Sequence, residues 1–303
     1  MRSDTVVPGL FEETRAVEFK EWLGNAWDEH ATDAASVASR IVSDGAALAT
    51  RSDDVGALAR LAHHVYGEHL ARYDDGRACL SQLAAHEHCA EAATLLRVLD
   101  AGLALAKGGE DPRIAFDVPT RIRITALASG SVVGHDPARA GALLMEAADS
   151  ADEVSLDDRD PACRALAITG NQMACALEEK PSRTNDERAL MIFAAQTARK
   201  FWARAGTWLE TERAEYRLAQ TWRRAGDFVQ ARRHAQQCLE IVNQNGAPAL
   251  EEFFGWEALA LAERDAGHAT GHARALANAR EAFERLEDSD RTWCERSLIA
   301  LGG

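Results

Sequence analysis

The chain has little of the residues that interrupt helices or favour strands. Its 303 residues include only 7 Pro, and aromatic and β-branched residues are sparse beside Ala, Leu, Glu and Arg. Because Ala, Leu, Glu and Arg are good helix formers, this balance predicts an all-α protein.

Cysteine and long apolar runs are also scarce. The 6 Cys are scattered without a CxxC pair, which excludes a small disulfide-stapled domain and favours buried free thiols. No run approaches the roughly 18 apolar residues that a membrane-spanning helix needs. The first 23 residues carry charges throughout and have no apolar segment typical of a signal peptide. We therefore expect a cytoplasmic protein without a membrane partner.

Lysine is nearly absent, and the charge is strongly negative. The chain has 4 Lys among its 34 basic residues and a net charge of −14, of which residues 1–160 carry −13. Because phosphate contacts dominate nucleic-acid affinity, an acidic chain argues against a nucleic-acid partner. The same charge argues against binding to an anionic membrane surface.

Enzyme signatures are missing. The sequence has no GxGxxG, GxxxxGK[ST], GxSxG, HExxH or ExxH pattern. We therefore predict no enzyme activity, no catalytic residue, no cofactor and no metal. Histidines do cluster at His63, His64 and His69 and again at His86 and His88. If these helices faced each other, a transition-metal site could form, although exposed polar helix faces are the simpler interpretation.

A repeated pattern of small and aromatic residues is the most informative feature present. In residues 214–245, Gly226-Asp227 separates two segments whose apolar spacing fits antiparallel helices. Related residues return one unit later, so that Ala219 and Ala260 are 41 residues apart, as are Gly226 and Gly267. Self-similarity at this period indicates a solenoid of helical hairpins, each burying its apolar face against its neighbours.

On these residues the chain resembles a tetratricopeptide-repeat protein of long period, best over about residues 160–290. The resemblance implies one all-α domain over residues 1–303, with about five to seven helical hairpins curved into a right-handed α-α superhelix. Within it, residues 1–159 hold degenerate repeats, 160–289 hold clearer repeats, and 290–303 form a C-terminal capping helix.

Helix periodicity and loop punctuation predict the individual helices. In the second half we expect helices at about residues 161–179, 185–205, 208–225, 228–244, 249–266, 269–287 and 290–301. In the first half we expect helices at about 10–28, from 34, from 52, at 119–133 and at 137–154, with 74–109 forming one long helix or two that meet near His86.

The resemblance implies a concave groove lined by the first helix of each hairpin. Around Leu218-Ala219, spacings of three and four place one stripe of residues toward this groove. These residues are Arg213, Tyr216, Arg217, Gln220 and Arg224. Because arginine binds carboxylates in a bidentate manner, the stripe predicts an acidic ligand. Residues 188–233 hold ten basic and four acidic residues; the alternative is that these arginines pair with acidic groups on neighbouring helices.

The flanking hairpins extend the groove. The preceding hairpin would contribute Asn171 and Gln172, and the following one Phe254 and Glu257. Asn171 resembles the asparagines that hold peptide backbones in this family. Phe254, with Phe253, would form either a pocket for an apolar side chain or part of the core. The family's Lys and Asn clamp for C-terminal carboxylates is not matched.

These residues predict a non-enzymatic adaptor or regulatory scaffold that binds an acidic peptide or protein segment. The alternatives are a sensor of a signalling peptide or small molecule that regulates an output protein and, less favoured, a metal-binding helical protein. A homodimer formed through Trp293 also stays open.

Overall fold

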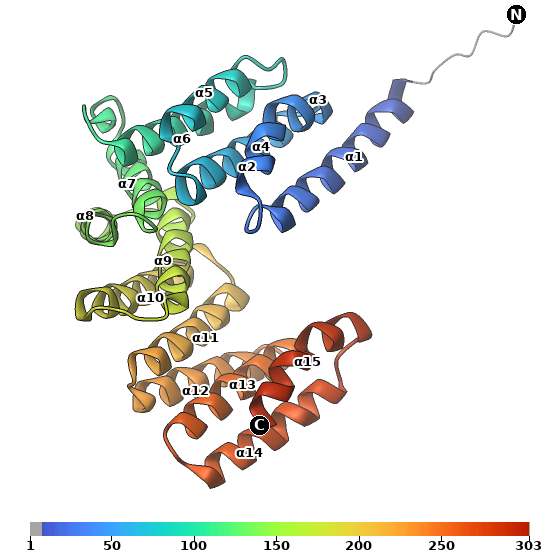
Figure 1. The fold of residues 1–303 in the computed structure, drawn as a ribbon, viewed down its shortest axis with the longest axis vertical. Coiled ribbons are helices and arrows are strands. Elements are labelled where there is room, and N and C mark those ends of the chain that lie inside the picture. Colours follow the sequence, from blue (N-terminus) through green and yellow to red (C-terminus); the bar gives the residue numbers. More distant parts are fainter. Residues whose placement is uncertain (1–7, 303) are drawn as a thin grey trace, which may run out of the picture. The chain divides into compact units, whose positions relative to one another are not determined.

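The computed structural model describes residues 8–302, which contain helices and connecting turns and no β-strand. The all-α fold class expected from the sequence is confirmed, with helices that pack in chain order against their neighbours (Figure 1). Within the described part, no helix combines the length and the apolar composition that a membrane crossing requires.

The chain divides into two compact units, residues 1–154 and 155–303. The division falls close to residue 160, where we expected degenerate repeats to give way to clearer ones. Each unit has a hydrophobic core of its own.

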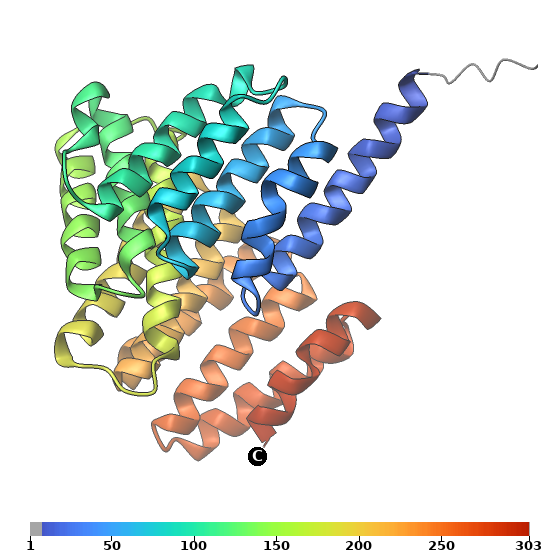
Figure 2. The same ribbon diagram turned by 45° about the horizontal axis from the view of Figure 1, so that its top comes forward.

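The first unit is built from helices of uneven length, with α4, α5 and α6 lying side by side (Figure 2). Its α-helices are α1 (Pro8–Glu29), α2 (Ala34–Arg40), α3 (Ala46–Leu48), α4 (Ser52–His63), α5 (Tyr73–Ala84), α6 (Ala93–Lys107), α7 (Val118–Val132) and α8 (Pro137–Glu153). Residues 74–109, for which the sequence left one long helix or two open, form two helices, α5 and α6. Turns around His86 separate them.

Two π-helical turns interrupt this unit, η1 (Ile41–Gly45) after α2 and η2 (His64–His69) after α4. Sequence periodicity did not predict either of them. At Gly45 a Cβ would lie 2.7 Å from side-chain atoms of both Leu58 and Trp22, so the close packing there needs glycine. Gly24 in α1 resembles the small residues of a tetratricopeptide hairpin, yet no described atom lies within 4 Å of a Cβ built there.

The second unit consists of regular antiparallel hairpins. Its helices are α9 (Pro161–Glu179), α10 (Asn185–Ala205), α11 (Trp208–Ala225), α12 (Phe228–Gln244), α13 (Ala249–Asp265), α14 (Ala269–Glu284) and α15 (Asp288–Gly302). The predicted helices agree with these bounds within three residues.

Local chemistry explains why these helices begin and end where they do. Thr184 and Thr207 start α10 and α11 with capping boxes, in which the threonine side chain and a glutamate three residues later satisfy free backbone amides. Gly226 ends α11 at φ 86°, a left-handed conformation that glycine adopts without a Cβ penalty.

In the second unit, each helix contacts its partner within the hairpin, and alternate helices also contact each other. Helix α11 packs against α10 and α12 and also contacts α9 and α13, while α15 lies against α13 and α14 (Figure 1). Contacts between residues one repeat apart therefore hold the hairpins together. Tyr216 and Glu257, which are 41 residues apart, share a hydrogen bond of 2.8 Å.

Candidate functional site

A cavity of about 420 Å³ opens on α9, α11, α13 and α15, which are alternate helices of the second unit. Its lining consists of Asn171, Glu212, Arg213, Tyr216, Arg217, Leu250, Glu251, Phe254 and Trp293. We call this cavity the groove pocket. It joins residues from three successive hairpins and from the last helix.

Aromatic rings form one wall of the groove pocket. The ring centroid of Phe254 lies 5.8 Å from that of Tyr216 and 5.1 Å from that of Trp293, in edge-on and tilted arrangements. Trp293 is 64% exposed, whereas Phe253 is fully buried in the core. Of the two alternatives for this pair, Phe254 therefore lines a pocket and Phe253 belongs to the core.

Buried polar groups behind this wall fix Tyr216. Its hydroxyl donates a hydrogen bond to Oε2 of Glu257, a buried carboxylate whose pKa is raised by that burial. Gln220 is also buried, and its Oε1 accepts a hydrogen bond of 3.0 Å from Nε of Arg223. Glu257 thus contacts the lining through Tyr216, and neither Gln220 nor Glu257 is part of the described lining.

The arginines of the groove pocket are paired with carboxylates one repeat away. Nη2 of Arg213 lies 3.0 Å from Oε1 of Glu251, and Nη1 of Arg217 lies 2.7 Å from Oε2 of Glu178. Thr221 donates to the other oxygen of Glu178.

Four more basic residues of the 188–233 segment form ion pairs with acidic groups of other elements. These pairs are Arg199–Glu215, Arg204–Asp158, Arg223–Asp265 and Arg232–Glu263. The alternative interpretation of the arginines, as partners of acids on neighbouring helices, therefore holds for these residues except Arg204, whose partner Asp158 lies in the turn before α9. The pairs largely offset the basic excess seen in the sequence.

Two polar atoms of the groove pocket have no hydrogen-bond partner among residues 8–302, Oε2 of Glu212 and Nε of Arg217, and both are buried. Glu212 is 1% exposed, and its Oε1 accepts a hydrogen bond of 2.8 Å from Sγ of Cys238. Burial raises the pKa of Glu212 to about 7, and the nearby Glu251 adds to this shift. Unpaired buried polar atoms cost free energy, and neither of these two is open to solvent in the present side-chain conformation.

Some of the predicted groove residues line the groove pocket and others lie outside its lining. Asn171, Arg213, Tyr216, Arg217 and Phe254 line the groove pocket, and Gln220 and Glu257 are buried outside it. The described lining does not include Gln172, which is half-buried, or Arg224, which is exposed.

Sequence reasoning did not assign Glu212, Leu250, Glu251 or Trp293 to the pocket. Helical spacing carried part of the signal, because Glu212 and Leu250 lie four residues before Tyr216 and Phe254 on the same helices. Trp293 had no such signal, since its place depends on how α15 packs against α13.

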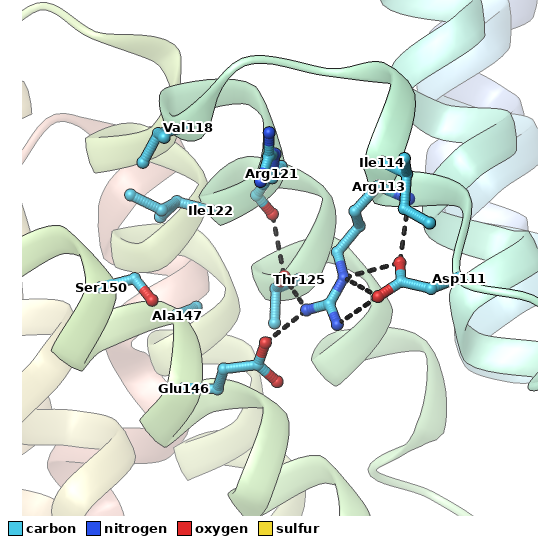
Figure 3. Close-up of a pocket in the computed structure, with 10 residues that line it drawn as sticks. All are labelled: Asp111, Arg113, Ile114, Val118, Arg121, Ile122, Thr125, Glu146, Ala147 and Ser150. Atoms are coloured by element: carbon cyan, nitrogen blue, oxygen red, sulfur yellow. Dashed lines mark hydrogen bonds and ion pairs between the residues drawn. The ribbon is translucent and has the colours of Figure 1, made fainter.

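A second pocket, of about 290 Å³, lies in the first unit around Arg113 (Figure 3). The guanidinium uses each of its nitrogens within the protein: Nε and Nη2 bond Asp111, and Nη1 bonds Thr125 and Glu146. The hydrogen bonds from Arg113 lower the pKa of Asp111 to about 2. This network joins the 3₁₀ turn η4 (Pro112–Ala115) to α7 and α8, and we interpret it as structural.

The histidines singled out in the sequence do not gather as one group. His63 is buried, which lowers its pKa to about 4. Nε2 of His86 lies 3.0 Å from the carbonyl oxygen of Ala46, and His88 lies beside it with 5.5 Å between the ring centroids. His64 instead meets His30 and His69.

Comparison with protein-family models, with curated proteins and with solved structures gave no match. The resemblance to tetratricopeptide repeats therefore rests on the repeat residues themselves. Because one fold supports many functions, the geometry of the site and not the fold carries the evidence for function.

Proposed function

We propose that this chain is a non-enzymatic adaptor or regulatory scaffold that binds an acidic peptide or protein segment in the groove pocket. The observation that carries this proposal is the convergence of an aromatic wall and an exposed guanidinium on four alternate helices. Arg213 keeps 61% of its side chain exposed despite its ion pair with Glu251, so its other N–H groups face solvent. We also propose that the hairpins are tetratricopeptide-like and that the protein acts in the cytoplasm.

The pocket suits a segment with an apolar side chain beside a carboxylate. The apolar side chain would pack against the exposed ring of Trp293 and the ring of Phe254, because aromatic rings offer a large contact area at low entropic cost. The carboxylate would take the free N–H groups of Arg213 in a charge-assisted hydrogen bond.

Backbone recognition would come from the polar residues of the lining. Asn171 offers both a donor and an acceptor, and Nε of Arg217 is a donor without a described partner. Oε2 of Glu212 would accept a peptide N–H when ionised, or donate to a carbonyl when protonated. Because both atoms are buried here, the side chains of Glu212 and Arg217 would turn toward the peptide when it binds.

The test identifies peptide ligands by selection from random sequences. The full chain is immobilised and used to select from a displayed library of random peptides. A selected peptide is then synthesised with a fluorescent label, and its affinity is measured by anisotropy. We expect the selected sequences to place an aromatic or large aliphatic residue next to Asp or Glu.

Arg213→Ala should weaken binding of the labelled peptide about tenfold or more, since a hydrogen bond to a charged group contributes about 1.5–3 kcal/mol. Arg224→Ala is the matched control, because Arg224 lies on the same helix, is exposed and is not part of the described lining. Circular dichroism checks that both variants keep their helices. Equal affinity of the two variants, or a selection without acidic residues, would contradict the proposal.

A second candidate function is a sensor of a small molecule or a short signalling peptide. The cavity volume of about 420 Å³ favours it, since ligand pockets usually measure about 300–1,000 Å³. A sensor would change its radius of gyration on binding, which X-ray scattering measures with and without the selected peptide. An unchanged radius with bound peptide would leave the passive adaptor as the better account.

A further inference from the structure

Three imidazole rings converge in the first unit, where the end of α1 meets the π-helical turn η2. His30 directly follows α1, and His64 and His69 are the first and last residues of η2. One ring nitrogen from each lies within 4.8 Å of the other two, and Nε2 of His64 is 3.1 Å from Nε2 of His69. The ring centroids are 4.8–4.9 Å apart.

The π-helical turn is what brings His64 and His69 together. In an α-helix, residues five apart point about 140° away from each other, so these rings would diverge. A π-turn takes about one more residue per turn, and the Leu70 amide accordingly bonds the Val65 carbonyl five residues back at 3.1 Å. Such turns are uncommon and occur frequently at functional sites.

Neighbouring acceptors orient two of the rings. Nδ1 of His64 lies 3.0 Å from Oε2 of Glu68, and Nδ1 of His30 donates to the carbonyl oxygen of Trp27. A proton held on Nδ1 leaves the lone pair on Nε2, which is the atom that a metal ion binds. Histidine ligands in metal sites almost always have such a second hydrogen bond to a carboxylate or a backbone carbonyl.

The setting is also compatible with ligation. The side chains of His64 and Glu68 are 14% and 19% exposed, and the Trp27 ring covers His30 and His64 at centroid distances of 5.3 and 5.2 Å. Tetrahedral Zn²⁺ with Zn–N bonds of about 2.0–2.1 Å requires nitrogens about 3.4 Å apart. The observed separations, from 3.1 Å to at most 4.8 Å, reach that value through small side-chain rotations.

We propose that His30, His64 and His69 form a binding site for a divalent transition-metal ion, with Glu68 positioning His64. Three imidazole ligands suit Zn²⁺ and leave its fourth coordination position open to water or to an added ligand. Bound metal would link the end of α1 to η2. This inference does not depend on the proposed function of the groove pocket, which lies in the other unit.

The test uses the full chain without a histidine tag, freed of metal by a chelator and then titrated with ZnCl₂ in a calorimeter. We expect one Zn²⁺ to bind per chain, and Co²⁺ to give the strong visible absorption of a tetrahedral site. His69→Gln should weaken Zn²⁺ binding at least tenfold, and His69 is exposed, so the variant should fold. Glu68→Gln should weaken it about tenfold through the orientation of His64.

His88→Gln is the matched control, because His88 is a partly exposed histidine beside a carboxylate, that of Glu87, outside the cluster. It should bind Zn²⁺ like the wild type. Zn²⁺ should also raise the melting temperature of the wild type and the control, but not that of His69→Gln. If the wild type binds no stoichiometric Zn²⁺, or if His69→Gln binds it equally well, the proposal is overturned.

Discussion

The buried carboxyl of Glu212 should make the stability of the second unit depend on pH. Burial, with a contribution from Glu251, raises the pKa of Glu212 from 4.5 to about 7 in the folded protein. In the unfolded chain the carboxyl is solvated and returns to its ordinary pKa. Between these two values the folded state holds a proton that the unfolded state has lost, so the stabilisation is complete below the lower pKa and is lost as the pH rises through the upper one.

The magnitude follows from the size of the shift. Each pKa unit corresponds to about 1.4 kcal/mol, so between pH 5 and pH 8 the carboxyl should destabilise the fold by about 2–3 kcal/mol. Glu212→Gln places a neutral amide at this position at every pH. Relative to this variant, the wild type should therefore lose about 2–3 kcal/mol of unfolding free energy over that interval.

The assay is urea unfolding followed by tryptophan fluorescence, at pH 5 and pH 8. Five of the seven tryptophans lie beyond residue 160, so the signal reports mainly on the second unit. Glu240→Gln on α12 is the control. Because Glu240 is exposed, its replacement should change the free energy of unfolding by the same amount at pH 5 and at pH 8. The wild type and Glu212→Gln should not differ in unfolding free energy by the same amount at both pH values. An equal difference would show that the fold does not raise the pKa of this carboxyl, and would refute the reasoning.

The remaining predictions concern packing. Gly170→Ala should lower the free energy of unfolding by about 1–3 kcal/mol, because a Cβ there would lie 2.6 Å from the Ala194 carbonyl oxygen, a backbone atom of α10. Gly24→Ala, with open space around its Cβ, should instead stabilise α1 by about 0.5–1 kcal/mol, and urea midpoints compare the two. Phe201→Ala should cost about 3–5 kcal/mol, since Phe201 is fully buried; an unchanged melting temperature would contradict its place in the core.

The helices of the second unit could be predicted because local signals determine them. The capping boxes at Thr184 and Thr207 and the glycine at position 226 act within one helical turn, so the sequence alone contains them. The π-helical turns were missed because the apolar pattern of α4 continues into η2, and the extra residue per turn depends on packing from other helices.

The groove pocket was predictable in part for a related reason. The spacing of Arg213, Tyr216 and Arg217 on one helix shows that they share a face, and all three line the pocket. It does not show which carboxylates they meet, because Glu251 and Glu178 are 38 and 39 residues away in the chain. Arg224 continues the same stripe but lies beyond the described lining of the cavity.

The central claim is that the groove pocket binds an acidic segment, and the most direct measurement is a crystal structure of the full chain with a selected peptide. The account predicts an apolar side chain of the peptide packed against Phe254 and Trp293, with a neighbouring carboxylate of the peptide bonded to the guanidinium of Arg213. A peptide seated elsewhere, with the pocket empty and the Arg213–Glu251 pair as it is here, would contradict it.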